Sequence, residues 1–151
     1  MLEKIPKNKE DVMDYRKFGN TYVVRLDRGE EIVEQVKELS LKEHITLATV
    51  QALGAVNDFT VGVFRPDEQK YDANSFQGCY EIVSLWGTIN TMNGEFYTHL
   101  HMSAGDDQGH VVGGHLNRAV ISAVCEMVIT EIPGTVDRAF DPSIGLNVLK
   151  F

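Results

Sequence analysis

The run Glu95-Phe-Tyr-Thr-His-Leu-His-Met-Ser103 alternates between two kinds of side chain, and this period of two predicts a β-strand. Successive side chains of a strand point to opposite faces of its sheet. One face should carry Glu95, Tyr97, His99, His101 and Ser103, and the other Phe96, Thr98, Leu100 and Met102. The sequence therefore places two imidazoles side by side.

The segments around this strand fix its neighbours. Asn93-Gly94 precedes it and is a strong signal for a tight hairpin, so the apolar run 80–89 should be the partner strand. The turn-rich segment 105–109 should then reverse the chain. Gly113 and Gly114 give the backbone freedom just before His115, which could bring a third imidazole back to the pair.

His99, His101 and His115 are therefore candidate ligands of a divalent metal, with zinc as the expected ion. Neutral imidazole nitrogens bind zinc well, and three of them plus water form an open site. The alternative is that these histidines make ordinary hydrogen bonds on a half-exposed strand. His110 belongs to the same loop and is expected to be a surface residue rather than a ligand.

The rest of the chain predicts an α+β domain, a largely antiparallel β-sheet with one or two helices. A helix should begin at Asp27 as N-cap, because apolar residues recur at helical spacing from Ile32. The nearly continuous apolar run 119–131 is expected to be a strand covered on both faces. Further strands are expected at 21–26, 45–53, 55–64 and 145–151, with a turn-rich segment at 66–76. We divide the chain into a lead-in, 1–20, and a single domain, 21–151.

Composition narrows the function classes. A net charge of −8 and a pI near 5.0 disfavour binding to free DNA, since the average surface repels phosphate. Cys79 and Cys125 lie in apolar runs without metal-type spacing, and we expect buried reduced thiols in a cytoplasmic protein. No segment is apolar enough for a membrane span, and the charged first ten residues do not resemble a secretion signal.

Three stretches together resemble the PPC family, the plants-and-prokaryotes-conserved domain. They are 78–87, the His-x-His strand followed by Gly109-His-Val-Val-Gly-Gly-His-Leu116, and 123–129. The resemblance implies a compact α+β domain that assembles as a homotrimer. Plant members carry AT-hook motifs, and stand-alone prokaryotic members are commonly labelled as DNA-binding. This chain has no Arg-Gly-Arg core of an AT-hook, which argues against direct DNA binding. Metal binding by the histidines is therefore the leading hypothesis, and a DNA-associated regulator without an AT-hook or a trimeric interaction scaffold are the alternatives.

Four further residues are candidates for contacts around the metal or with a small ligand. Glu95 and Tyr97 share the strand face of His99, and Arg118 follows the Gly-Gly-His-Leu element. Glu126 interrupts an apolar strand, and a buried carboxylate there would need a partner such as Arg118, a histidine or a neighbouring subunit. No nucleophile, acid–base pair or cofactor loop identifies a reaction, so an enzymatic activity stays undecided.

Overall fold

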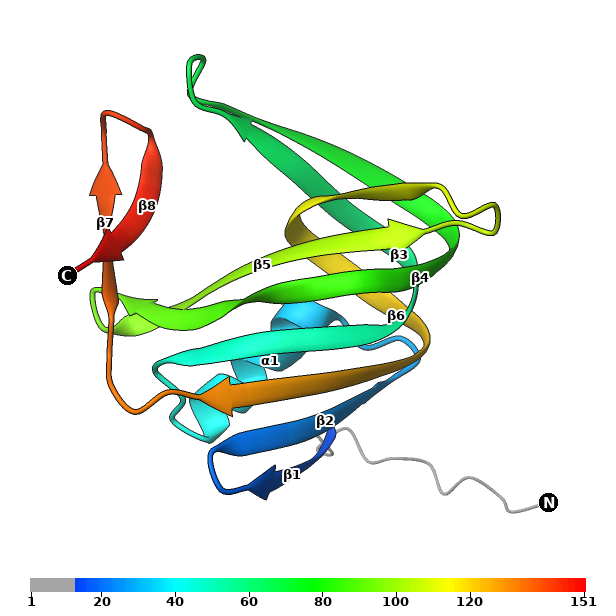
Figure 1. The fold of residues 1–151 in the computed structure, drawn as a ribbon, viewed down its shortest axis with the longest axis horizontal. Helices are drawn as coiled ribbons and strands as arrows, with labels where there is room; N and C mark the ends of the chain where they lie inside the picture. The colour runs from blue at the N-terminus through cyan, green and yellow to red at the C-terminus, as the bar shows by residue number, and fades with distance from the viewer. Residues whose placement is uncertain (1–12) are drawn as a thin grey trace.

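A six-stranded antiparallel sheet forms the body of the protein, with one helix against one face and a small C-terminal hairpin beside it (Figure 1). The structure is a computed structural model that describes residues 13–151. The strands of the main sheet run in the order β1-β2-β6-β3-β4-β5. The elements are β1 (Asp14–Phe18), β2 (Thr21–Asp27), α1 (Ile32–Lys42), β3 (Ala48–Arg65), β4 (Lys70–Met92), β5 (Glu95–Gly105), β6 (Val111–Glu131), β7 (Asp137–Asp141) and β8 (Leu146–Lys150). The predicted α+β class is confirmed.

The end of the predicted lead-in, 1–20, takes part in the sheet. Residues 1–12 lie outside the described part of the chain, whereas β1 pairs with β2, and Asp14 lies opposite Arg25. The strand conformation of β1 depends on its pairing with β2, because the side chains of β1 are mostly charged or exposed. β1 is an edge strand of the sheet, and no local sequence pattern predicts it.

The helix starts later than the sequence suggested. Its N-cap is Glu31, whose carboxylate accepts a hydrogen bond from the backbone N–H of Glu34 at 2.8 Å. Asp27 instead ends β2, so its prediction as N-cap was wrong. The predicted apolar stripe is present, and Ile32, Val36 and Leu39 are buried against the sheet. Among residues 13–151, no helix has the length and apolar character that crossing a membrane requires.

Two strands, β3 and β4, are longer than any single strand that the sequence predicted for them. The predicted strands 45–53 and 55–64 form the single strand β3, which continues through a bulge at Gly54. The predicted turn-rich segment 66–76 contributes most of its residues to β4, which begins at Lys70. Backbone pairing between β3 and β4 continues beyond the core. The side chains there are exposed, so polar residues are compatible with the strands.

The sheet has one covered and one open face. β6 alternates, with Cys125, Met127 and Ile129 buried under the helix side and Glu126 exposed on the other side. The expectations that β6 is covered on both faces and that Glu126 is buried are therefore wrong for the single chain. Cys125 is buried as predicted, but Cys79 is exposed.

Candidate metal centre

His99, His101 and His115 lie together on adjoining strands, and we call them the histidine cluster. His101 of β5 pairs directly with His115 of β6. The ring centroids are 5.0 Å apart for His99 and His101, 5.1 Å for His99 and His115, and 5.8 Å for His101 and His115. The chain reversal between β5 and β6 therefore brings the third imidazole back to the first two, as the sequence predicted.

The nitrogen positions fit a single small cation. The Nε2 atoms of His99 and His101 are 3.1 Å apart, and one nitrogen from each of the three rings lies within 4.8 Å of the others. Two nitrogens of a tetrahedral zinc site, each about 2.0–2.1 Å from the ion, lie roughly 3.3 Å from one another. Small rotations of the rings would suffice for all three to reach one ion.

Partial burial keeps two of the three histidines, His99 and His115, in the form that binds metal. Desolvation, helped by the nearby His115, His101 and Arg138, lowers the pKa of His99 to about 4. Desolvation and His101 also lower the pKa of His115. Both rings are thus neutral at pH 7, with a ring nitrogen lone pair available.

Two glycines allow β6 to pass close to its neighbours just before His115. A Cβ on Gly113 would lie 2.7 Å from the carbonyl oxygen of Met102 in β5, and one on Gly114 would lie 2.4 Å from the carbonyl oxygen of Gly62 in β3. β6 pairs with both of these strands here. The two glycines are therefore needed because the strands approach each other closely here. This is a second role beside the backbone freedom that the sequence suggested.

The Gly113→Ala variant should show both lower stability and weaker metal binding. Its added methyl forces β6 away from β5, and overpacking of this kind costs about 1–3 kcal/mol. The shift also separates His115 from His101. Thermal unfolding and zinc titration measure the two effects, with Gly105→Ala as the control, because its Cβ would meet nothing closer than 3.5 Å. If Gly113→Ala and Gly105→Ala had the same stability and the same zinc affinity, the proposed role of Gly113 in close strand approach would be contradicted.

Tyr71 contacts both His115 and Asn117, and no local sequence pattern predicted a role for Tyr71. The Tyr71 ring stands edge-on to the His115 ring at 5.8 Å between centroids. Its hydroxyl donates to Oδ1 of Asn117 and, at 3.4 Å, to the backbone carbonyl of His115. Tyr71 lies in the segment that had been predicted as turn-rich, far along the chain from the histidines.

Only some of the residues that the sequence predicted around the metal lie near the histidine cluster. Tyr97 lies on the same face of β5 as His99, two residues away, while Glu95 is exposed at the start of that strand. Arg118 instead forms a two-point ion pair with Asp58, at 2.9 and 3.1 Å. His110 is exposed and contacts Asp106 at 3.2 Å, so it is a surface residue as predicted.

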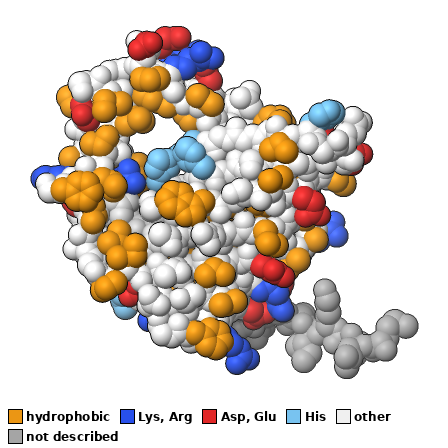
Figure 2. Space-filling view, in the orientation of Figure 1, with side chains coloured by type: hydrophobic (Ala, Val, Ile, Leu, Met, Phe, Trp, Pro, Cys, Tyr) orange, Lys and Arg blue, Asp and Glu red, His pale blue; other side chains and the backbone are white. Residues whose placement is uncertain are grey.

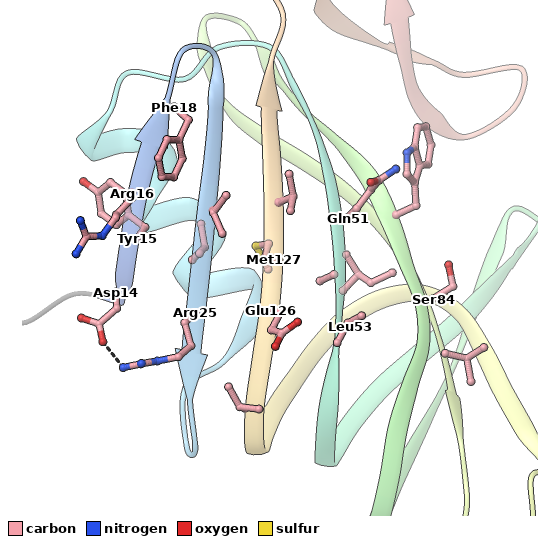
Figure 3. A pocket seen from close by; sticks show the side chains of 18 residues that line it. Asp14, Tyr15, Arg16, Phe18, Arg25, Gln51, Leu53, Ser84, Glu126 and Met127 are labelled. Carbon is pink, nitrogen blue, oxygen red and sulfur yellow. Dashed lines mark hydrogen bonds and ion pairs between the residues drawn. The ribbon is translucent and has the colours of Figure 1, made fainter. Parts of the chain in front are cut away.

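Glu126 belongs to a second feature, a broad groove on the open face of the sheet (Figure 3). The groove has a volume of about 1100 Å³ and runs across β1, β2, β6, β3 and β4. Its exposed apolar lining consists of Phe18, Val23, Leu53, Val83, Trp86, Val124 and Val128. We call these seven residues and the groove between them the apolar groove.

Trp86 and Ser84 connect the apolar groove to the histidine cluster. Both also line a smaller pocket of about 420 Å³ that includes His99 and His101. Trp86 pairs directly with His101 across β4 and β5, and its side chain is 53% exposed. Figure 2 shows hydrophobic side chains beside the clustered histidines and a hollow at their edge. Pockets of roughly 300–1,000 Å³ commonly hold small ligands.

A family profile matches most of the chain. The family profile of the Plants and Prokaryotes Conserved (PCC) domain matches residues 13–133. No curated protein sequence matches the chain significantly.

Three solved structures are similar over nearly the whole chain. A Bacteroides thetaiotaomicron protein, provisionally described as DNA-binding, has 30% identity and a TM-score of 0.90, covering 93% of this chain and 99% of its own. A metal-containing protein from Archaeoglobus fulgidus has 30% identity and a TM-score of 0.83 with the same coverage. A plant- and prokaryote-conserved protein from Pyrococcus horikoshii has 26% identity and a TM-score of 0.80, covering 100% of this chain and 98% of its own. With the profile match and these similarities, the chain belongs to the Plants and Prokaryotes Conserved domain family.

Proposed function

We propose that this protein binds one divalent metal ion, preferably zinc, through His99, His101 and His115. The observation that carries the proposal is the convergence of three imidazole nitrogens within 4.8 Å of one another. Low pKa values keep two of the rings neutral, and the similar protein from Archaeoglobus fulgidus is described as metal-containing. An ion with three histidine ligands keeps a position for water or a small ligand.

Elemental analysis tests this proposal directly. The purified protein, dialysed against equimolar zinc and then against metal-free buffer, should retain about one ion per chain, as expected for a single three-histidine site. Replacement of zinc by cobalt should give the visible absorption of a four-coordinate ion with nitrogen ligands. Retention of no ion in either experiment would contradict the proposed site.

We also propose that the protein assembles as a homotrimer through the apolar groove. The groove gathers seven exposed apolar side chains on one face, and contiguous patches of this kind mark interaction surfaces. Its continuity with the histidine pocket through Trp86 would place the metal near a subunit boundary. A small ligand at the metal would then bind close to that boundary.

DNA binding is the second candidate, supported by the description of the similar protein from Bacteroides thetaiotaomicron. The net charge of −8 opposes it, because phosphate contacts require clustered basic side chains. A gel shift with generic and A·T-rich duplexes at about 0.15 M salt separates the two functions, since DNA binding weakens steeply as salt rises. Salt-sensitive retardation would favour the second candidate.

A further inference from the structure

Arg138 is a buried cation without a carboxylate partner among residues 13–151. Only 7% of its surface is exposed, and it is the one buried ionisable side chain in the described part of the chain apart from Tyr22 and Cys125. Its Nε donates to Oδ1 of Asn90 and its Nη1 to the carbonyl of Asn147, both at 2.9 Å. These partners are neutral, so they fix the guanidinium in place without balancing its charge.

The guanidinium lies on the histidine side of the sheet. Its central carbon is 4.7 Å from the centre of the Tyr97 ring. Tyr97 pairs with Asn90 across β5 and β4, and the next pair on the same face contains His99. Successive pairs on one face are roughly 7 Å apart. Arg138 is therefore about one such step beyond the histidine cluster, near enough that its charge also lowers the pKa of His99.

Two hairpins frame the space beside the histidines. The β3–β4 hairpin and the β7–β8 hairpin both project beyond the main sheet (Figure 1). Nε2 of Gln69, in the turn between β3 and β4, donates to the carbonyls of Pro142 and Ser143 at 3.1 and 3.4 Å. This contact joins the two hairpin turns, and the surface is hollowed beside the clustered histidines (Figure 2).

One terminal nitrogen of the guanidinium, Nη2, is unused. Nη2 of Arg138 makes no hydrogen bond with residues 13–151, and Gln35 Oε1 is the only side-chain atom of that part that is both enclosed and unpaired. Nη2 therefore retains contact with solvent. A free guanidinium N–H binds a carboxylate oxygen well, because a hydrogen bond between two charged groups is about twice as strong as a neutral one.

We propose that the hollow binds a small organic carboxylate, with its carboxylate on Arg138 and its other end at the metal. The inference rests on the metal site proposed above. Both the ion and the guanidinium are positive, so an anion between them would offset the cost of burying Arg138. The ring of Tyr97 would line the side of the ligand between these two charges. A single arginine suits the one charge of a carboxylate better than the nearly two charges of a phosphate.

Malonate is a suitable probe, because it has a carboxylate at each end. Titration of malonate into the cobalt-loaded protein should change the visible spectrum in a saturable way. Malonamide, its neutral counterpart, should bind at least tenfold more weakly, and inorganic phosphate should bind more weakly than malonate. Malonamide or phosphate binding as tightly as malonate would overturn the carboxylate assignment.

Arg138→Gln tests the residue itself. Its malonate affinity should fall at least tenfold while its cobalt content stays at the wild-type level, and Arg138→Lys should be intermediate. Circular dichroism shows whether each variant folds, and Arg138→Lys keeps the test valid if the glutamine variant does not. Malonate affinity that is unchanged in the folded variants would overturn the proposal.

The two proposals fail in different ways. If the wild-type protein retains no metal, the metal site fails, and calorimetric titration of malonate into the metal-free protein still tests Arg138. Arg138-dependent binding in that experiment would support the anion site alone. Absence of malonate binding to both forms would overturn the inference, as would a carboxylate of another subunit found on Arg138 in the assembled protein.

Discussion

The His115→Ala variant should retain less than about a tenth of a metal ion per chain under conditions in which the wild type retains about one, because two histidines are too few for a stable zinc site. His115 is the ligand that β6 brings back to β5, opposite His101. Its loss leaves His99 and His101, whose nitrogens are 3.1 Å apart, without the third donor. Even loss of a hydrogen-bonding partner of a ligand costs roughly 10–100-fold in metal affinity, so loss of a ligand should cost more.

His110→Ala is the matched control for this prediction. It removes an imidazole from the loop before β6, but His110 is exposed and contacts Asp106 rather than the histidine cluster. Its metal content should equal that of the wild type. Elemental analysis after dialysis, followed by competition with a zinc-binding dye, gives occupancy and affinity. A His115→Ala variant that retains the wild-type ion content would rule out the three-histidine site.

Local sequence patterns predicted the centre of the site because each step is short in sequence. The alternation from Glu95 to Ser103 fixed the face of His99 and His101, and the Asn93-Gly94 turn fixed the partner strand. Both turn residues have positive φ, 53° and 77°, as a tight hairpin of this kind requires. The reversal before Gly113 then determined that β6 returns along β5.

Contacts between distant segments could not be predicted in this way. Tyr71 reaches His115, and Arg138 reaches Asn90, across more than forty residues each. Their positions depend on the register of β3 with β4 and on the docking of the β7–β8 hairpin, neither of which has a local signal. Glu126 illustrates a different error. The apolar run around it predicted burial on both faces of the strand, whereas alternate side chains of β6, including Glu126, line an open groove.

The Leu53→Lys variant should convert the proposed trimer to a monomer. Leu53 lies in the apolar groove, opposite Glu126 in the strand register, and is 56% exposed in the single chain. A lysine there can pair with Glu126 in the monomer, so folding should change little. Burial of a charge at a subunit contact costs several kcal/mol for each ion, and every subunit would contribute one.

Leu41→Lys is the matched control, because Leu41 is 54% exposed but lies on α1, on the other side of the sheet. Light scattering at micromolar concentration should give three times the chain mass of 16.9 kDa for the wild type and for Leu41→Lys, and one chain mass for Leu53→Lys. A monomeric wild type, or a trimeric Leu53→Lys variant, would contradict assembly through the apolar groove. Since all three histidines belong to one chain, the monomeric variant should still retain about one ion, which separates the metal site from the assembly.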